Sequence, residues 1–176
     1  MRRALIVVDM QAGSFTDATP RHDAGGLVVR LNALADRVRR DGGLVIFVQH
    51  EGPPGDPYHP GEPGFELLPD LHVEPSDRII RKRFCDAFIE TSLASDLDAA
   101  SVEQIILTGC ATDYCVDTTV RAALSRGHQT LAPSDGHTTT DRPHLCAAKI
   151  IEHHNALWEG FISPVGPAQV RPCDEV

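Results

Sequence analysis

The sequence lacks three features, each of which would have assigned it to a broad class of proteins. Its longest unbroken aliphatic run, Ala4–Val8, spans five residues, far short of the roughly 20 that a membrane-spanning helix needs. No Cys-x-x-Cys pair occurs, so neither a zinc ribbon nor a thioredoxin-type pair is indicated. Positive charge is scarce, because 16 Lys and Arg residues stand against 25 Asp and Glu residues, for a net charge of −9. We therefore expect no nucleic-acid partner and no membrane partner.

Cysteine usage and the first residues both predict a reducing compartment. The cysteines are odd in number and irregularly spaced, which favours free thiols over a disulfide framework; they are Cys85, Cys110, Cys115, Cys146 and Cys173. The opening residues, Met-Arg-Arg-Ala-Leu-Ile, show neither the long apolar core nor the small-residue cleavage site of a signal peptide. We therefore expect a cytoplasmic protein with reduced cysteines, one of which is a candidate reactive thiol.

Short apolar runs alternate with amphipathic stretches along the chain. The runs predict strands at Ala4–Val8, Leu44–Val48, Ile79–Lys82, Ile105–Leu107, Gln129–Ala132 and Phe161–Ser163. The amphipathic stretches predict helices at Ala24–Arg40, Thr91–Ala99, Asp113–Ser125 and Pro143–His153. Strands that alternate with helices imply crossover connections and a parallel sheet covered on both faces. The chain therefore predicts a single α/β domain, residues 1–176, with a three-layer α/β/α Rossmann-like fold and a mostly parallel six-stranded sheet.

One segment breaks the alternation and directs attention to one end of the sheet. Glu51–Pro75 holds seven of the 13 prolines, which predicts a long surface loop, and such loops are often functional. In open parallel sheets, ligands bind outside the carboxyl ends of the strands. That rule selects the residues that follow the predicted strands, namely Asp9–Phe15, His50, Lys82–Asp86, Gly109–Cys115 and Asp135–His137.

Three of these residues form a chemically coherent set. Cys115 falls in the first turn of a predicted helix, where the helix dipole favours an anion and lowers the pKa of a thiol. Asp9 and Lys82 each end a predicted strand, where a buried charge is costly unless it has a partner. Taken singly, Cys115 is equally compatible with a role as a small buried hydrophobic residue. Asp9 and Lys82, taken singly, are compatible with roles as ion-pair partners or caps. Taken together, they bring acid, amine and thiol to one sheet edge, where the ammonium can hold both anions and the carboxylate can accept the thiol proton.

The segments that carry these residues resemble those of a known superfamily. They are Val7-Val8-Asp9-Met10-Gln11, Ile80-Arg81-Lys82-Arg83-Phe84 and Leu107-Thr108-Gly109-Cys110-Ala111-Thr112-Asp113-Tyr114-Cys115-Val116. In order and spacing they resemble the isochorismatase-like cysteine hydrolases, the superfamily that includes nicotinamidases and N-carbamoylsarcosine amidohydrolases. The similarity runs from residue 4 to about residue 163.

The resemblance implies a role for each matched residue. Cys115 matches the nucleophile, Asp9 the proton acceptor, and Lys82 the cation that orients and tunes both. The family also carries a non-proline cis peptide, which here would join Cys110 to Ala111, and an oxyanion hole formed by the backbone N–H groups that match Ala111 and Cys115. The implied enzyme is an amidohydrolase that cleaves a C–N bond of a small amide, carbamoyl, ureido or lactam substrate through a thioester.

The sequence departs from nicotinamidases in the long loop. Those enzymes carry a metal site made from an Asp-x-His pair and a second histidine, whereas this loop offers Asp56, His59 and His72 with Asp-x-x-His spacing. We therefore predict no metal and no cofactor, which argues against nicotinamidase activity. Isochorismatases themselves cleave a vinyl ether and need no thiol at the position of Cys115, so the cysteine favours an amide-type substrate.

Four further residues are candidates for binding the small-molecule substrate, with structural support as their alternative role: Gln11, Phe15, His50 and Tyr114. The Gln11 amide could hydrogen-bond a polar group of the substrate, and His50 could reach a substrate carboxylate. Histidines near the predicted helix ends could suggest metal ligation, although such histidines more often complement the helix dipole or make hydrogen bonds; they are His137, His153 and His154.

Two other functions fit the same scaffold. A redox or sensor protein would pair Cys110 with Cys115 in a reversible disulfide and would hydrolyse nothing, and a catalytically silent member would serve in assembly. The resemblance also implies a homodimer or homotetramer, and we expect an exposed region around Trp158 that is compatible with such contacts.

Overall fold

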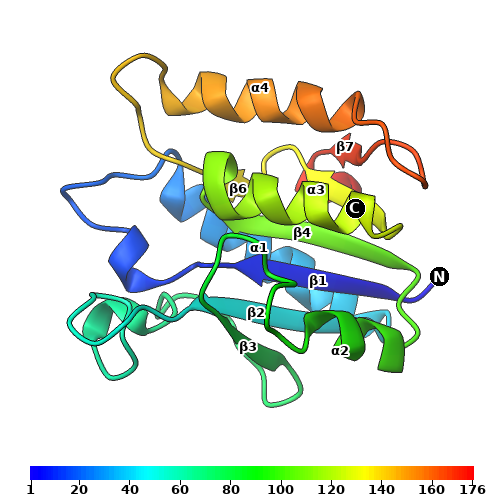
Figure 1. Cartoon of the computed structure of the whole chain (residues 1–176), viewed down its shortest axis with the longest axis horizontal. Helices are drawn as coiled ribbons and strands as arrows, with labels where there is room; N and C mark the ends of the chain where they lie inside the picture. The colour runs from blue at the N-terminus through cyan, green and yellow to red at the C-terminus, as the bar shows by residue number, and fades with distance from the viewer.

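A parallel sheet forms the centre of the computed structural model, which describes residues 1–176 (Figure 1). Its strands are β1 (Arg3–Val8), β2 (Leu44–His50), β3 (Arg78–Lys82), β4 (Gln104–Cys110), β5 (Gln129–Pro133), β6 (His137–Thr138) and β7 (Gln169–Arg171). Their order is β3-β2-β1-β4-β5-β7, with β6 paired to β4, and every pairing is parallel. The sheet thus has the parallel character that the alternating pattern predicts.

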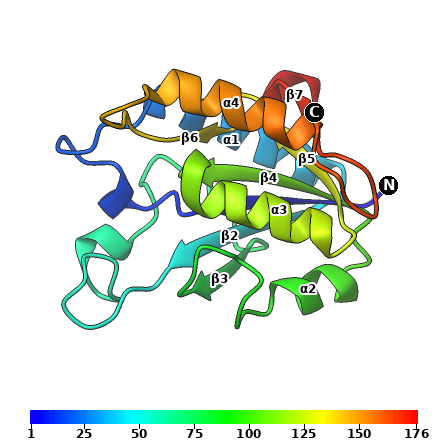
Figure 2. The ribbon, with the colours of Figure 1, turned by 45° about the horizontal axis from the view of Figure 1, so that its top comes forward.

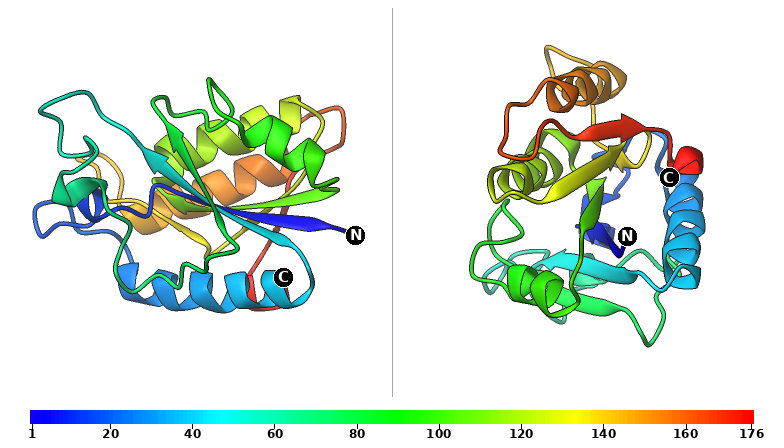
Figure 3. Two further views of the ribbon diagram at one scale, coloured as in Figure 1. Left: turned by 90° about the horizontal axis from the view of Figure 1, so that it is seen from below. Right: turned by 90° about the vertical axis from the view of Figure 1, so that its right-hand side faces the viewer.

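Helices cover both faces of the sheet. They are α1 (Ala24–Arg40), α2 (Leu93–Ala99), α3 (Asp117–Ser125) and α4 (Ala147–Glu159). The left view of Figure 3 places α1 on one face and the other three helices on the opposite face. Figure 2 shows α3 and α4 running side by side. The three-layer α/β/α fold is therefore confirmed. Four short helical turns complete the structure: η1 (Ala12–Ser14), η2 (Pro63–Phe65), η3 (Thr112–Val116, a π-helical turn) and η4 (Cys173–Glu175).

Strand β1 shows why a continuous apolar run is needed at the centre of this sheet. Leu5 and Val7 belong to the core beneath α1, whereas Ala4, Ile6 and Val8 belong to the core beneath the other helices. All five side chains are buried, and burying each large aliphatic one contributes about 1.5–3 kcal/mol. A strand with one polar face could not support helices on both sides.

Helix α1 matches its predicted bounds, because its pattern is amphipathic and strong. Its buried residues are Leu27, Leu31, Leu34, Ala35 and Val38, which recur at the spacing of one helical face. The helix ends before Gly42, whose φ of +73° favours glycine.

The C-terminal part of the fold differs from the prediction. Residues 161–163 form no strand, and Ile162 in their middle is 95% exposed. The sheet instead gains β7 beside β5 and β6 beside β4, so it has seven strands rather than six. These two strands span three and two residues, too few for a periodic pattern to reveal them.

The expected exposure of Trp158 is wrong. The indole is completely buried, and its N–H donates a hydrogen bond of 2.8 Å to Asp117 at the start of α3. Trp158 therefore fastens α4 to α3 and offers no surface for assembly. The homodimer or homotetramer implied by the family stays a prediction. None of the helices has the combined length and hydropathy that a membrane span requires.

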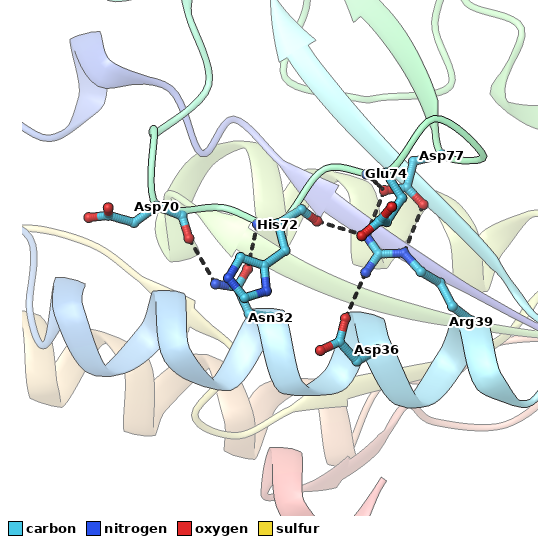
Figure 4. A network of polar contacts seen from close by, with 7 residues as sticks. All are labelled: Asn32, Asp36, Arg39, Asp70, His72, Glu74 and Asp77. Carbon is cyan, nitrogen blue, oxygen red and sulfur yellow. Dashed lines mark hydrogen bonds and ion pairs between the residues drawn. The ribbon is translucent and has the colours of Figure 1, made fainter.

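The long loop after β2 is fastened to α1 by two side chains of that helix (Figure 4). Arg39 donates to both carboxylate oxygens of Asp77, at 3.0 and 2.6 Å, and to the carbonyl of His72 at 2.8 Å. Asn32 donates to the carbonyl of Asp70 at 2.8 Å and accepts from the N–H of His72 at 2.9 Å. The hydrogen bond to Asp77 raises the pKa of Arg39. These contacts give the proline-rich loop a defined course.

We expect Asp77→Ala to lower the free energy of unfolding by about 2–4 kcal/mol, because it removes the one buried carboxylate partner of a largely buried guanidinium. The Asp77 side chain is 2% exposed. The matched control is Asp36→Ala, which removes the other carboxylate partner of Arg39; the Asp36 side chain is 46% exposed, so this change should cost less than about 1 kcal/mol. Urea denaturation of both variants measures the difference, and equal costs would contradict the assigned role of Asp77.

Candidate active site

The side chains of Asp9, Lys82 and Cys115 meet at the carboxyl end of the sheet. The Lys82 ammonium donates to Asp9 Oδ2 at 2.6 Å and to Cys115 Sγ at 3.3 Å. The Lys82 side chain is 0% exposed and that of Asp9 is 7% exposed. Asp9 directly follows β1, Lys82 ends β3, and Cys115 lies in η3 just after β4. The structure therefore brings together the three residues that the sequence selects.

The strand order explains why the bridging residue has a long side chain. Strand β2 lies between β3 and β1, and adjacent strands are about 4.8 Å apart, so Lys82 starts roughly 10 Å from β1. Its four-carbon stem spans the end of β2 to reach the carboxylate. Asp9 is held for this contact by its backbone, because its N–H donates to the carbonyl of Val48 at 2.8 Å. Its φ of 50° lies in the left-handed region, which aspartate tolerates better than most residues.

A glycine in β4 brings the nucleophile segment close to the carboxylate. A Cβ atom on Gly109 would lie 2.1 Å from the carbonyl oxygen of Val8, and its φ of +119° also favours glycine. Beyond Gly109 the chain passes through a cis peptide bond between Cys110 and Ala111 and enters η3. Any side chain at position 109 would push β4 away from β1 and displace Cys115 from Asp9.

The charges of this group tune one another. Burial alone would lower the pKa of Lys82, but the negative charge of Asp9, the charge that Cys115 can carry and hydrogen bonds to both residues raise it instead. Burial and the charge of Asp9 raise the pKa of the Cys115 thiol, and the positive charge of Lys82 opposes this rise. The helix-start argument predicts a lowered thiol pKa and is wrong here, because desolvation and a neighbouring carboxylate outweigh it. Burial and the charge of Asp9 therefore favour the protonated form of the sulfur.

A cavity of about 550 Å³ opens above the sulfur. Asp9, Ala111 and Cys115 contribute to its wall, as do His50 and Tyr114. This volume lies within the range of small-molecule sites. The cavity therefore gives a small compound access to the thiol and to the carboxylate together.

Two of the four residues predicted to bind substrate lie outside the cavity. Gln11 is completely buried; its amide nitrogen donates to the carbonyls of His50 and Phe65 at 3.0 and 2.8 Å, and its oxygen accepts from the N–H of His50 at 2.7 Å. All of its polar atoms are therefore used to join the long loop to β2. Phe15 packs against the core beneath α1.

The other two line the cavity. Burial and the nearby charge of Lys82 lower the pKa of His50, which favours the neutral ring and a hydrogen-bonding role over an ion pair with a carboxylate. Tyr114 is 55% exposed at the rim, where the Arg142 guanidinium lies 5.1 Å from the centre of its ring.

The histidines and acids of the long loop are placed apart. Asp56 accepts from the N–H of Tyr58 at 2.8 Å, the His59 ring lies 3.2 Å from the carbonyl of Gly52, and His72 lies beside α1 (Figure 4). Nowhere in residues 1–176 do three His, Cys, Asp or Glu side chains converge so that they could hold a metal ion.

His137 supports the turn that carries the nucleophile. Its Nε2 lies 3.0 Å from Asn155 Oδ1, and the Asn155 amide nitrogen donates to the carbonyl of Ser134. The His137 Nε2 therefore carries a proton, and its Nδ1 accepts from the Thr112 hydroxyl at 2.9 Å. His153 and His154 also lie on α4 but make no hydrogen bond to His137, and the His154 ring lies 2.8 Å from the carbonyl of Ile150 in its own helix.

Similarity to known proteins assigns the chain to a family. The family model described as the isochorismatase domain matches residues 3–159, so the chain belongs to the isochorismatase family. A streptothricin hydrolase of Streptomyces noursei is 36% identical over 141 residues, which cover 80% of this chain and 51% of that protein. The chain thus spans about half the length of this relative.

Solved structures agree with this assignment. The crystal structure of an isochorismatase family protein superimposes with a TM-score of 0.88 and 31% identity and covers 96% of both chains. An N-carbamoylsarcosine amidase from Thermoplasma acidophilum superimposes with a TM-score of 0.80 and 25% identity and covers 100% of this chain and 99% of that one.

Neutralising Asp9 should make the Cys115 thiol more reactive. Asp9→Asn removes the negative charge that raises the pKa of Cys115, so iodoacetamide should label this cysteine about ten times faster at pH 8. Lys82→Met removes the opposing positive charge and should slow the labelling. Peptide mass spectrometry distinguishes Cys115 from the exposed Cys85 and Cys146. The reverse order of rates would contradict the electrostatic assignment.

The burial of His137 should make the fold sensitive to acid. Burial lowers its pKa from 6.5 to about 4, so the folded state excludes a proton that the unfolded chain binds. The neutral ring's contribution to stability is present above pH 6.5 and is lost as pH falls towards 4. Between pH 7 and pH 5 this loss is about 2 kcal/mol. Urea denaturation at both pH values should show that the parent loses about 2 kcal/mol more unfolding free energy than His137→Gln. Equal losses in the two proteins would refute the assigned role of His137.

Proposed function

We propose that the protein is a cysteine amidohydrolase that cleaves a C–N bond of a small amide, carbamoyl, ureido or lactam compound through a thioester on Cys115. The observation that carries the proposal is the contact of one buried ammonium, Lys82, with both a carboxylate and a sulfur at the base of a small-molecule cavity. The names of the streptothricin hydrolase and the N-carbamoylsarcosine amidase agree with hydrolysis of this class of compound.

The first half of the reaction transfers the acyl group to sulfur. Asp9 accepts the thiol proton while Cys115 Sγ attacks the carbonyl carbon of the substrate. Asp9 Oδ1 is suited to this task, because it is buried and has no hydrogen-bond partner in the chain. The positive charge of Lys82 stabilises the negative sulfur as the proton leaves. When the tetrahedral intermediate collapses, the C–N bond breaks and Asp9 returns the proton to the leaving nitrogen.

The second half releases the acid. Water attacks the thioester carbonyl while Asp9 takes one of its protons, and the C–S bond breaks as that proton passes to the sulfur. The balanced reaction consumes one water and yields an amine or ammonia and an acid, so it needs no cofactor. The enzyme ends with the protonated thiol with which it began.

The backbone around the nucleophile offers donors for the oxyanion. Ala111 lines the cavity, and its N–H donates no hydrogen bond within the chain. We propose that this group and the N–H of Cys115 receive the substrate oxygen during attack. Such donors typically stabilise the transition state by about 3–4 kcal/mol each.

A redox pairing of Cys110 with Cys115 is the weaker candidate. Cys110 is 1% exposed, and burial raises the pKa of its thiol to about 12. Disulfide exchange needs a thiolate, and burial disfavours the thiolate form of both sulfurs. A catalytically silent protein is the remaining alternative, and a substrate screen separates it from an active enzyme.

Two variants test the proposed chemistry by removing either the nucleophile or the group that moves the proton. Cys115→Ala should lower ammonia release from a panel of small amides and ureido compounds by at least about a thousand-fold, because no nucleophile remains. Asp9→Asn should be similarly inactive although its thiol is more reactive towards iodoacetamide, because no group moves the proton.

Exposed cysteines provide the matched control. Cys146→Ala removes an exposed thiol outside the cavity and should release ammonia at the parent rate. Full activity of Cys115→Ala, or inactivity of the parent on every compound of the panel, would refute the proposed function.

A further inference from the structure

The charged groups that line the cavity are all partnered except one. Asp9 is neutralised by Lys82. Arg142 pairs with Asp113 at 2.8 Å, and Arg83 pairs with Glu90 at 3.2 Å while remaining mostly exposed. Arg21 also lines the cavity, but its only hydrogen bond within the chain runs from Nε to the carbonyl of Ser14, at 2.6 Å. After these pairings, one positive charge in the wall is left without a counter-charge.

Arg21 is fixed in place although its charge is unpaired. The bond from its Nε to the Ser14 carbonyl holds the guanidinium, and the two terminal nitrogens donate to no protein group. Two hydroxyl groups also line the cavity, those of Ser14 and Tyr58. Ser14 is the residue whose carbonyl holds Arg21, and its Oγ shares a hydrogen bond of 2.8 Å with Tyr58 Oη. The positive charge of Arg21 counteracts the burial that raises the pKa of both Cys110 and Tyr58. Its charge therefore acts inside the cavity.

We propose that Arg21, with the hydroxyls of Ser14 and Tyr58, binds a carboxylate of the substrate, so that the enzyme prefers anionic amides or ureido acids to neutral compounds. A planar guanidinium with two free nitrogens matches a carboxylate through paired hydrogen bonds. One unpaired positive charge also fits the single charge of a carboxylate better than a phosphate, which carries nearly two. This inference rests on the proposed function, because it assigns the substrate class of the same cavity.

In this proposal the two ends of the cavity have different functions. Arg21 selects and orients the anionic end of the compound, whereas Asp9 and Cys115 act on the carbonyl at the other end. Arg83 and Arg142 already have carboxylate partners, and the surroundings of His50 disfavour its charged form, which leaves Arg21 as the anion-binding group. Arg21 is thus a specificity-determining residue that takes no part in the proton transfers.

A pair of nearly isosteric ureas tests the proposal. N-carbamoylglycine carries a carboxylate, and 2-hydroxyethylurea carries an uncharged hydroxymethyl group in its place. We expect the parent enzyme to hydrolyse the acid with a kcat/KM about ten- to a hundred-fold higher than the alcohol, which is the effect of a charge-assisted pair. Arg21→Gln should abolish this ratio by slowing hydrolysis of the acid alone, and Arg21→Lys should keep part of it.

Arg83→Gln is the matched control, because it removes a cavity-lining guanidinium that already has a carboxylate partner. This variant should keep the preference for the acid. Hydrolysis of the two ureas by the parent at equal, measurable rates, or a preference that survives Arg21→Gln, would overturn the carboxylate subsite while leaving the hydrolase proposal intact.

Binding without turnover separates the two proposals. Calorimetry with Cys115→Ala should show that N-carbamoylglycine binds more tightly than 2-hydroxyethylurea, and adding Arg21→Gln should weaken binding of the acid about ten-fold or more. If the parent hydrolyses neither urea, this result still supports the subsite while the hydrolase proposal fails for ureido compounds. Binding of the acid that does not respond to Arg21→Gln, or no binding of the acid, would overturn the subsite.

Discussion

The burial of one ammonium group is the constraint on which this structure depends. Lys82 is completely enclosed, and a buried charge without a partner costs several kcal/mol. Asp9 offsets that cost at 2.6 Å, and the sulfur of Cys115 accepts a second hydrogen bond. The contact between Lys82 and Asp9 joins β3 to β1 across the end of β2. The same interaction that stabilises the end of the sheet therefore brings a carboxylate, a cation and a thiol together.

Other residues fix the positions of the segments that carry Asp9, Lys82 and Cys115 and leave the cavity above them open. Gly109 allows β4 to lie against β1, so that η3 presents Cys115 beside the carboxylate. Gln11 uses its whole amide group to join β2 to the long loop, and Arg39 fastens the far part of that loop to α1. None of these side chains touches the sulfur. They fix the positions of the segments that surround the cavity.

The parts of the fold that follow from local physics could be predicted from the sequence. Strand β1 and helix α1 are strongly patterned, so the sequence indicates the type of both, the bounds of α1, and the bounds of β1 to within one residue. The convergence of Asp9, Lys82 and Cys115 follows from the rule that parallel strands share a carboxyl edge. Strands β6 and β7 are too short to carry a pattern, and the burial of Trp158 depends on a contact with a distant helix.

The chemistry of the site was less accessible from the sequence. The raised pKa of the Cys115 thiol reflects desolvation and a carboxylate that only the folded chain provides. Gln11 has the residue type of a substrate ligand, but its partners come from the backbone of residues far along the chain. Arg21 and Tyr58 were missed because neither directly follows a strand, and Ser14 was not singled out within the selected segment Asp9–Phe15. The single available signal was the position of Arg21, which lies after the first sheet-end segment in a stretch without a predicted element.

The central claim is that acyl transfer passes through the sulfur held by Lys82. Rapid acid quenching of the enzyme during turnover, followed by mass spectrometry of its peptides, tests this claim most directly. The account predicts an acyl adduct on the peptide that contains Cys115, formed before product and lost as the acid is released. Steady hydrolysis with no adduct on that peptide, in an experiment able to detect a synthetic thioester on the same cysteine, would contradict it.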